Sequence, residues 1–189
     1  MVASRADAAM DAEALFAALP PPTCTTIARL RAKGVSPDAL CEPEVPAQAR
    51  VTFGLQTFDF ADGDGGMPAL VFVALDERGE PADLVAWSPA ERRCAPHWGA
   101  ACLLGAESLL APRLTNQNAL PVYRDPLGWL LGGRFGVVPI DLQSAALKLR
   151  EFGPFRAEDE RHGIELRRLF RQTEPQIFVP KPDRVRRAA

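Results

Sequence analysis

Residues 69–87 read ALVFVALDERGEPADLVAW, and this stretch decides the fold class. A continuous apolar run at residues 69–75 is followed by turn-forming residues at 76–79 and by a second, mostly apolar run at 83–87. Two runs of strand length that are separated by a short polar turn predict neighbouring antiparallel strands. The centre of the molecule is therefore expected to be a sheet built around this hairpin.

A further strand is expected before the hairpin. Apolar and polar side chains alternate over residues 51–60, and the alternation changes phase at Thr57. Successive side chains of a strand point to opposite faces, so a change of phase inside one strand predicts a bulge or a bend. Together with the hairpin, this strand predicts an antiparallel meander of three strands.

Helical and extended patterns alternate after the meander. Helices are expected at residues 98–111, 126–131, 142–152 and 157–171, and strands at 120–124, 135–140 and 176–179. Gly132 and Gly133 are expected to end the second of these helices. Strands that come together first and alternate with helices afterwards predict an α+β fold, a mixed sheet with an N-terminal antiparallel meander and helices packed against it.

The N-terminal part is expected to be helical, because short amphipathic stretches there are separated by prolines that end helices. These helices are expected at residues 7–19, 24–33 and 36–40. The chain is thereby divided into a helical N-terminal segment at residues 1–47, a single α+β domain at 48–179 and a basic flexible tail at 180–189.

The composition is that of an ordinary globular chain. Of its 189 residues, 47% are hydrophobic and 24% are charged, with 22 basic and 24 acidic side chains and a formal net charge of −2. These fractions exclude disorder along the whole chain. No apolar run approaches the roughly 18 residues that a membrane-spanning helix needs, so we expect no membrane partner.

The start of the chain lacks the basic stretch and unbroken apolar segment of a secretory signal, since Asp7, Asp11 and Glu13 interrupt the only candidate. We therefore expect a cytoplasmic protein with reduced thiols.

Charge is distributed unevenly along the chain. Residues 148–189 carry 11 basic and seven acidic side chains, a net charge of +4, and the preceding residues carry a net charge of −6. Arginines at this end could follow a nucleic-acid backbone, or they could form a solvated helix face and a basic tail. The candidate contacts are Arg161, Arg167, Arg168, Arg171, Arg184, Arg186 and Arg187.

Two groups of residues are candidate metal ligands. Cys94, His97 and Cys102 could bind zinc with Cys24 or Cys41 as a fourth ligand, or the cysteines could be small buried apolar residues. The second group is a cluster of three aspartates in a glycine-rich loop, which could hold a hard cation or could simply connect two strands. These residues are Asp59, Asp62 and Asp64.

The sequence contains no complete catalytic motif, and we expect no obligatory cofactor. His162 lies between Asp159 and Glu165, whose carboxylates are expected to favour its charged form. The glycines of residues 132–136 suggest a phosphate-binding loop, but they precede an expected strand rather than open a helix.

Four short stretches carry a resemblance to a known group of proteins: DLVAW at residues 83–87, VYRDPLGW at 122–129, GVV at 136–138, and DERHG with ELR at 159–167. Over residues 83–179 the chain resembles uncharacterised small proteins of prophages and mobile elements from high-GC proteobacteria. The resemblance implies an accessory role in a mobile element and no particular catalytic residues.

The leading hypothesis from the sequence is a non-enzymatic accessory or protein-interaction domain of prophage or mobile-element origin, with an unidentified protein partner. One alternative is a nucleic-acid-associated protein that uses the arginine-rich C-terminal region. The other is a cation-dependent hydrolase that uses the aspartate cluster.

Overall fold

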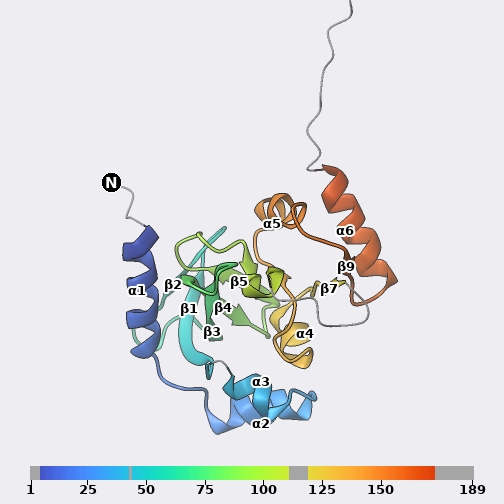
Figure 1. Cartoon of the computed structure of the whole chain (residues 1–189). Coiled ribbons are helices and arrows are strands. Elements are labelled where there is room, and N and C mark those ends of the chain that lie inside the picture. The colour runs from blue at the N-terminus through green and yellow to red at the C-terminus, as the bar shows by residue number, and fades with distance from the viewer. Residues whose placement is uncertain (1–4, 43, 111–118, 173–189) are drawn as a thin grey trace, which may run out of the picture.

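The chain folds around a five-stranded antiparallel sheet with helices on both faces (Figure 1). The computed structural model describes residues 5–42, 44–110 and 119–172. The strand order is β2-β1-β3-β4-β5, and the strands are β1 (Ala47–Phe53), β2 (Phe58–Phe60), β3 (Met67–Leu75), β4 (Pro81–Ser88) and β5 (Arg93–Pro96). The predicted α+β fold is confirmed.

The central pair of strands is the hairpin that the sequence predicts. Strands β3 and β4 are antiparallel, with Leu70 opposite Trp87. The Asp76 carboxylate accepts the backbone N–H groups of Arg78 and Glu80 at 2.8 and 3.0 Å, and this fixes the turn between the strands.

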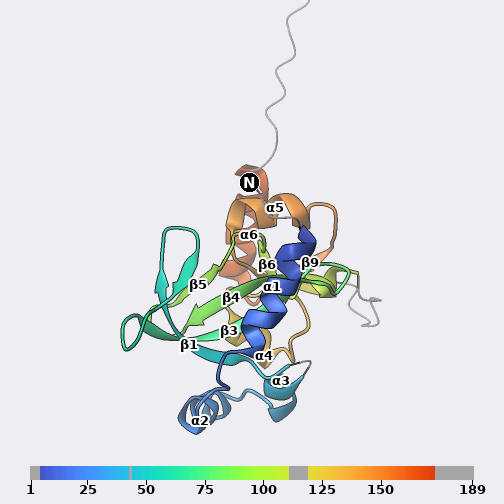
Figure 2. The same ribbon diagram turned by 90° about the vertical axis from the view of Figure 1, so that its left-hand side faces the viewer.

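Both faces of this sheet are buried, which explains why its central strands are continuously apolar. Val71 and Leu84 face helix α1 (Arg5–Ala17), which crosses one side of the sheet (Figure 2). Phe72 and Val85 face the other side, together with residues of three short helices. These are α2 (Cys24–Ala32), α3 (Pro37–Cys41) and α4 (Pro126–Leu131).

The segment at 51–60 is a hairpin, and the predicted bulge or bend in a single strand is wrong. Val51 on β1 pairs with Phe60 on β2, and the backbone N–H of Gly54 donates to the carbonyl of Thr57 at 2.8 Å. The change of phase at Thr57 therefore marks a reversal of the chain.

The helix predicted at residues 98–111 is also wrong. This segment contains a loop, the short strand β6 (Leu103–Leu104) and the 3₁₀ helix η1 (Ala106–Leu109). The fully buried carboxylate of Asp83 takes five backbone N–H groups at 2.7–3.1 Å, four of them from residues 97–101, and so holds that part as a loop.

The C-terminal elements form a separate core beside the main sheet. Strand β6 pairs antiparallel with β8 (Val138–Pro139), and β7 (Leu120–Pro121) pairs parallel with β9 (Phe155–Arg156). The parallel pairing of the expected mixed sheet thus lies outside the five-stranded sheet.

Helices α5 (Leu142–Leu149) and α6 (Glu160–Gln172) pack over these strands through residues such as Leu149 and Leu166. The strand expected at 176–179 and the tail at 180–189 lie outside the described residues. None of the described helices is both long and apolar enough to cross a membrane.

Candidate functional site

The aspartate loop does not gather its carboxylates around a common point. The side chains of Asp59, Asp62 and Asp64 are all exposed. The guanidinium of Arg50 donates to two carbonyl oxygens of the loop, at 2.6 and 2.7 Å. Within the described residues, no three His, Cys, Asp or Glu side chains are grouped closely enough to hold a metal ion. The loop therefore connects β2 to β3, and its backbone is held by hydrogen bonds from Arg50 rather than by a metal ion.

The structure also separates the residues of the expected zinc site. Cys94 packs into the core beside α4, and Cys102 packs into the C-terminal core; burial raises the pKa of both thiols. The Nδ1 atom of His97 donates to a backbone carbonyl of β2 at 2.9 Å. The proposed fourth ligands, Cys24 and Cys41, are exposed. The three residues close in sequence therefore point into three different surroundings.

The candidate nucleic-acid contacts are divided between a described helix and the end of the chain. Four are exposed on α6 and three lie outside the described residues: first Arg161, Arg167, Arg168 and Arg171, then Arg184, Arg186 and Arg187. Arg161 is paired with Glu165 at 3.1 Å.

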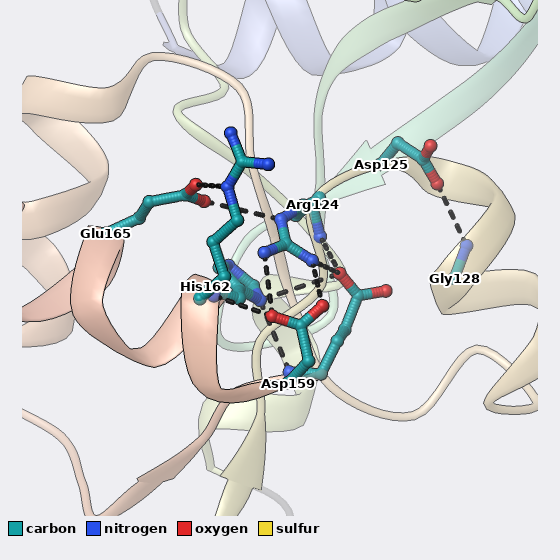
Figure 3. Close-up of polar contacts among 8 residues, drawn as sticks. Arg124, Asp125, Gly128, Asp159, His162 and Glu165 are labelled. Carbon is teal, nitrogen blue, oxygen red and sulfur yellow. Dashed lines mark hydrogen bonds and ion pairs between the residues drawn. The ribbon is translucent and has the colours of Figure 1, made fainter.

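The acidic side chains at the start of α6 are occupied by an arginine from outside the helix (Figure 3). Arg124 Nη1 and Nη2 lie 2.5 and 2.9 Å from the two carboxylate oxygens of Asp159, and its Nε lies 3.3 Å from Glu165. Its backbone N–H donates to Glu158 at 3.0 Å. Hydrogen bonding to Arg124 holds the pKa of Asp159 well below its usual range. The network fastens α6 to the segment before α4.

His162 belongs to this network as a buried imidazole, whose Nδ1 also lies 3.5 Å from the Glu158 carboxylate. Its Nδ1 accepts the backbone N–H of Glu158 at 3.3 Å, and only 4% of the residue is exposed. Burial, followed by the nearby charge of Arg124, lowers the pKa of His162 in spite of the flanking carboxylates. The flanking carboxylates favour the charged form as expected, but burial and the charge of Arg124 outweigh them.

A different arrangement is formed at the other end of α4. The backbone N–H of Arg134 donates to the carbonyl of Trp129 at 2.9 Å, and that of Gly133 donates to Leu130 at 3.1 Å. Gly133 has φ of 69°, so these bonds form a Schellman motif. The two glycines predicted to end the helix thus bring the side chains of Trp129 and Arg134 together.

The Arg134 side chain lies against two aromatic rings. Its guanidinium carbon is 5.5 Å from the centre of the Trp129 ring and 5.9 Å from that of Phe72. Its Nε donates to the carbonyl of Ala39 at 2.7 Å. Burial lowers the pKa of Arg134, and its Nη2 is buried without a hydrogen-bond partner.

Glu107 on η1 is the acidic residue of the same region. Burial raises its pKa, against the opposing effects of its own backbone N–H and the charge of Arg134. Gly105, with φ of 81°, begins η1, and a Cβ there would collide with Trp129 and with the carbonyl of Gly136. Glycine therefore allows η1 and α4 to approach closely.

These side chains line a cavity of about 220 Å³ between α1, β3, η1 and α4. Among the described residues, four buried side-chain atoms have no hydrogen-bond partner in the protein. Three of the four belong to residues that line this cavity, although the atoms themselves are covered by the protein: Glu107 Oε2, Trp129 Nε1 and Arg134 Nη2. Glu13 and Glu44 stand exposed at its rim. We call this the Arg134 cavity.

A larger hollow of about 540 Å³ lies between α2 and the sheet and is mainly apolar. None of the four unpartnered atoms found in the described residues belongs to its lining. The Arg134 cavity is therefore distinguished by the half-buried charged side chains of Glu107 and Arg134 among its apolar walls.

Comparison of the chain with family models, curated proteins and solved structures gave no match. The residues of the Arg134 cavity are also those that sequence reasoning missed as a site. Local sequence offered one signal, the spacing of Trp129, the glycine pair and Arg134, which predicts that the tryptophan and arginine meet when the helix ends at the glycines.

Proposed function

We propose that this protein is a non-enzymatic recognition domain that binds a small polar group in the Arg134 cavity. The observation that carries the proposal is a pair of half-buried charged side chains, Arg134 and Glu107, on the walls of one cavity. Burial lowers the pKa of Arg134 and raises that of Glu107, which means that burial disfavours the charged form of both. Proteins retain destabilising features of this kind mainly where function requires them.

The character of the lining supports binding rather than chemistry. The described residues around the cavity include no Ser, Thr, Cys, Lys or His that could act as a nucleophile or as a paired base. His97 and His162 lie elsewhere, in the sheet edge and at α6 respectively. The lining combines apolar walls with a few polar groups, as binding pockets commonly do.

The cellular setting is a further part of this proposal. The resemblance of residues 83–179 to prophage and mobile-element proteins supports an accessory role. The four cysteines are unpaired, which supports a reducing, cytoplasmic compartment. In that setting the recognised group belongs either to a partner protein or to a small molecule.

The proposal is tested by nuclear magnetic resonance of the full chain with nicotinamide, nicotinic acid and benzylamine as probes. The indole N–H signal of Trp129 is assigned with the Trp129→Phe variant and followed during each titration. We expect at least one probe to shift it in the unchanged protein.

Two matched variants are compared. Val73→Phe places a larger side chain on the cavity wall and so fills part of the cavity, whereas Leu55→Phe changes a fully exposed apolar residue. The shift should disappear with Val73→Phe and persist with Leu55→Phe. Absence of any shift, or a shift that survives filling of the cavity, would contradict the recognition role.

A nucleic-acid-associated function is a second candidate, favoured by the charges of α6. Arg124 occupies the acidic side chains at the start of this helix. Arg167, Arg168 and Arg171 are exposed and form no ion pair within the described residues. The end of α6 that leads to the basic tail is therefore the more positive end.

This candidate is tested by measuring the binding of labelled duplex DNA and single-stranded RNA to the full chain over a range of salt concentrations. Changing the three arginines to glutamine should lower the slope of the salt dependence on duplex DNA by about 0.9 for each phosphate that is no longer neutralised. The control changes three exposed cations at the end of α2 and at its C-cap, namely Arg29, Arg31 and Lys33. Equal effects of the two triple variants would exclude a specific role of α6.

A further inference from the structure

The larger hollow, of about 540 Å³ between α2 and the sheet, is a second place where a ligand has room. We call it the α2 hollow. In the described part of the chain it shares no lining residue with the Arg134 cavity. Its apolar walls include the buried side chains of Leu30 on α2 and Leu70 on β3, and the exposed Pro68 and Pro89 continue these walls to the surface. The volume is that of a site for a small molecule with an apolar body.

The charged side chains that line the α2 hollow are all cations. Arg29 and Lys33 lie one helical turn apart, and no acidic side chain of the described residues belongs to the lining. Both cations are exposed, so they stand at the rim. Neither forms an ion pair or a side-chain hydrogen bond within the described residues. The hollow therefore combines apolar walls with a rim whose positive charge is not neutralised by the protein.

Gln48 adds a neutral hydrogen-bond donor to the lining. Its Oε1 atom accepts the hydroxyl of Thr26 at 2.8 Å and the backbone N–H of Thr23 at 3.1 Å, which fixes the orientation of the side-chain amide. The Nε2 atom is the other end of this amide, and it has no hydrogen-bond partner among the residues that the structure describes. Since an amide nitrogen only donates, Gln48 favours an acceptor, as the two cations do.

We infer that the α2 hollow binds a small monocarboxylate with an unbranched apolar chain, of the kind that a medium-chain fatty acid provides. The carboxylate pairs with Arg29 and Lys33, and the chain packs against Leu30 and Leu70. A hollow with charge of one sign and apolar walls concentrates ions of the opposite sign. The apolar walls reward a buried hydrocarbon chain and offer nothing to a second charge on the ligand. This site is independent of the function proposed for the Arg134 cavity.

The cations of α2 have a second possible role, because the C-terminal end of a helix attracts positive charge. Arg31 lies in the same last turn and is exposed, but it does not line the α2 hollow. A cation that serves only the end of the helix should act on a ligand equally from position 29 and from position 31. Arg31 is therefore the matched control for Arg29.

The experiment titrates the full chain with octanoate, octanol and octylamine, which share one hydrocarbon chain and differ in their head groups. Binding is followed by nuclear magnetic resonance at the backbone N–H signals of residues 29–33 and 69–70. We expect octanoate to bind about fivefold more tightly than the other two, because exposed charge pairs contribute modestly. From butanoate to hexanoate to octanoate, affinity should rise by up to about fourfold for each methylene group that is buried.

Two pairs of variants on α2 locate the site. Arg29→Gln should weaken octanoate binding by about two- to fivefold, whereas Arg31→Gln should leave it unchanged. Ala32→Trp places a large side chain at an exposed position of the lining and should weaken binding at least tenfold. Ala28→Trp makes the same change at an exposed position outside the lining and should have no effect.

The inference is overturned if octanol or octylamine binds as tightly as octanoate, since the cations then select nothing. It is also overturned if the two glutamine variants have equal effects, or if binding survives Ala32→Trp. Absence of binding by any of the probes would overturn it as well. All four substituted positions are exposed, so these variants are expected to fold.

Discussion

Arg124 and Arg134 flank the same short helix, α4, and the protein holds them in opposite ways. Arg124 is near the surface and interacts with three carboxylates. Its side chain donates hydrogen bonds to Asp159 and Glu165 and forms an ion pair with Glu158. Arg134 lies against aromatic rings, with Nη2 unpartnered and Glu107 near it but not hydrogen bonded to it.

The comparison shows how a structural charge can be told from one held for a ligand. The Arg124 network is complete within the protein and joins α6 to the rest of the fold (Figure 3). The Arg134 group is incomplete in a place where incompleteness destabilises the fold.

Charge reversal should separate the two arginines most strongly. Arg134→Glu places a further carboxylate beside Glu107 and Glu44 in a half-buried position, and we expect a loss of about 3–5 kcal/mol in the free energy of unfolding. Arg124→Glu should produce a smaller loss that shrinks in high salt, because its partners are exposed. Urea unfolding at two salt concentrations measures both. Equal losses for the two variants would remove the distinction.

The two regions should also respond to pH with opposite signs. The folded-state pKa of Asp159 is lowered from 3.8, so its contribution to stability is present above that value and is lost as the pH falls below it. The folded-state pKa of Glu107 is raised from 4.5, so its contribution is present below 4.5 and is lost as the pH rises.

These signs are measured by the unfolding free energy of two neutral variants between pH 3 and pH 7. As the pH rises, Asp159→Asn should become less stable relative to the unchanged protein, and Glu107→Gln should become more stable relative to it. Parallel curves for the two variants would show that the cavity carboxyl is as well satisfied as the surface one.

The smallest expected loss of stability is at Trp129. Trp129→Phe removes an N–H group that has no acceptor and retains a ring for the contact with Arg134. We expect the unfolding free energy to fall by about 1–2 kcal/mol, because the smaller ring leaves unfilled volume in the core around a residue that is 4% exposed. A loss of more than about 3 kcal/mol would show that the indole N–H contributes to the fold beyond the packing of the ring.

Sequence patterns were sufficient where the structure depends on neighbouring residues. The β3–β4 hairpin and the ending of α4 at Gly132 and Gly133 were predicted because apolar runs, turns and helix ends are local signals. The helix expected at 157–171 was predicted for the same reason, and α6 occupies most of that range. The α+β class followed from the order of these elements.

Long-range contacts account for what the sequence did not show. The segment at 98–111 has helical periodicity, but the buried carboxylate of Asp83 binds its backbone N–H groups and holds its first part as a loop. The Arg134 cavity takes residues from α1, β3, η1 and α4, which are far apart in the chain. No local sequence pattern predicts that Glu107 and Arg134 lie on the same cavity, so this site could be found only in the folded structure.

The central claim is that the polar groups of the Arg134 cavity are kept for a ligand at the expense of stability. The most direct test is Glu107→Met, which replaces a buried carboxyl by an apolar side chain of similar length. We predict that the free energy of unfolding at pH 7 rises by about 1 kcal/mol and that binding of the probe molecules in the cavity is lost. A fall of similar size would contradict the account, because it would show that Glu107 stabilises the fold through partners of its own.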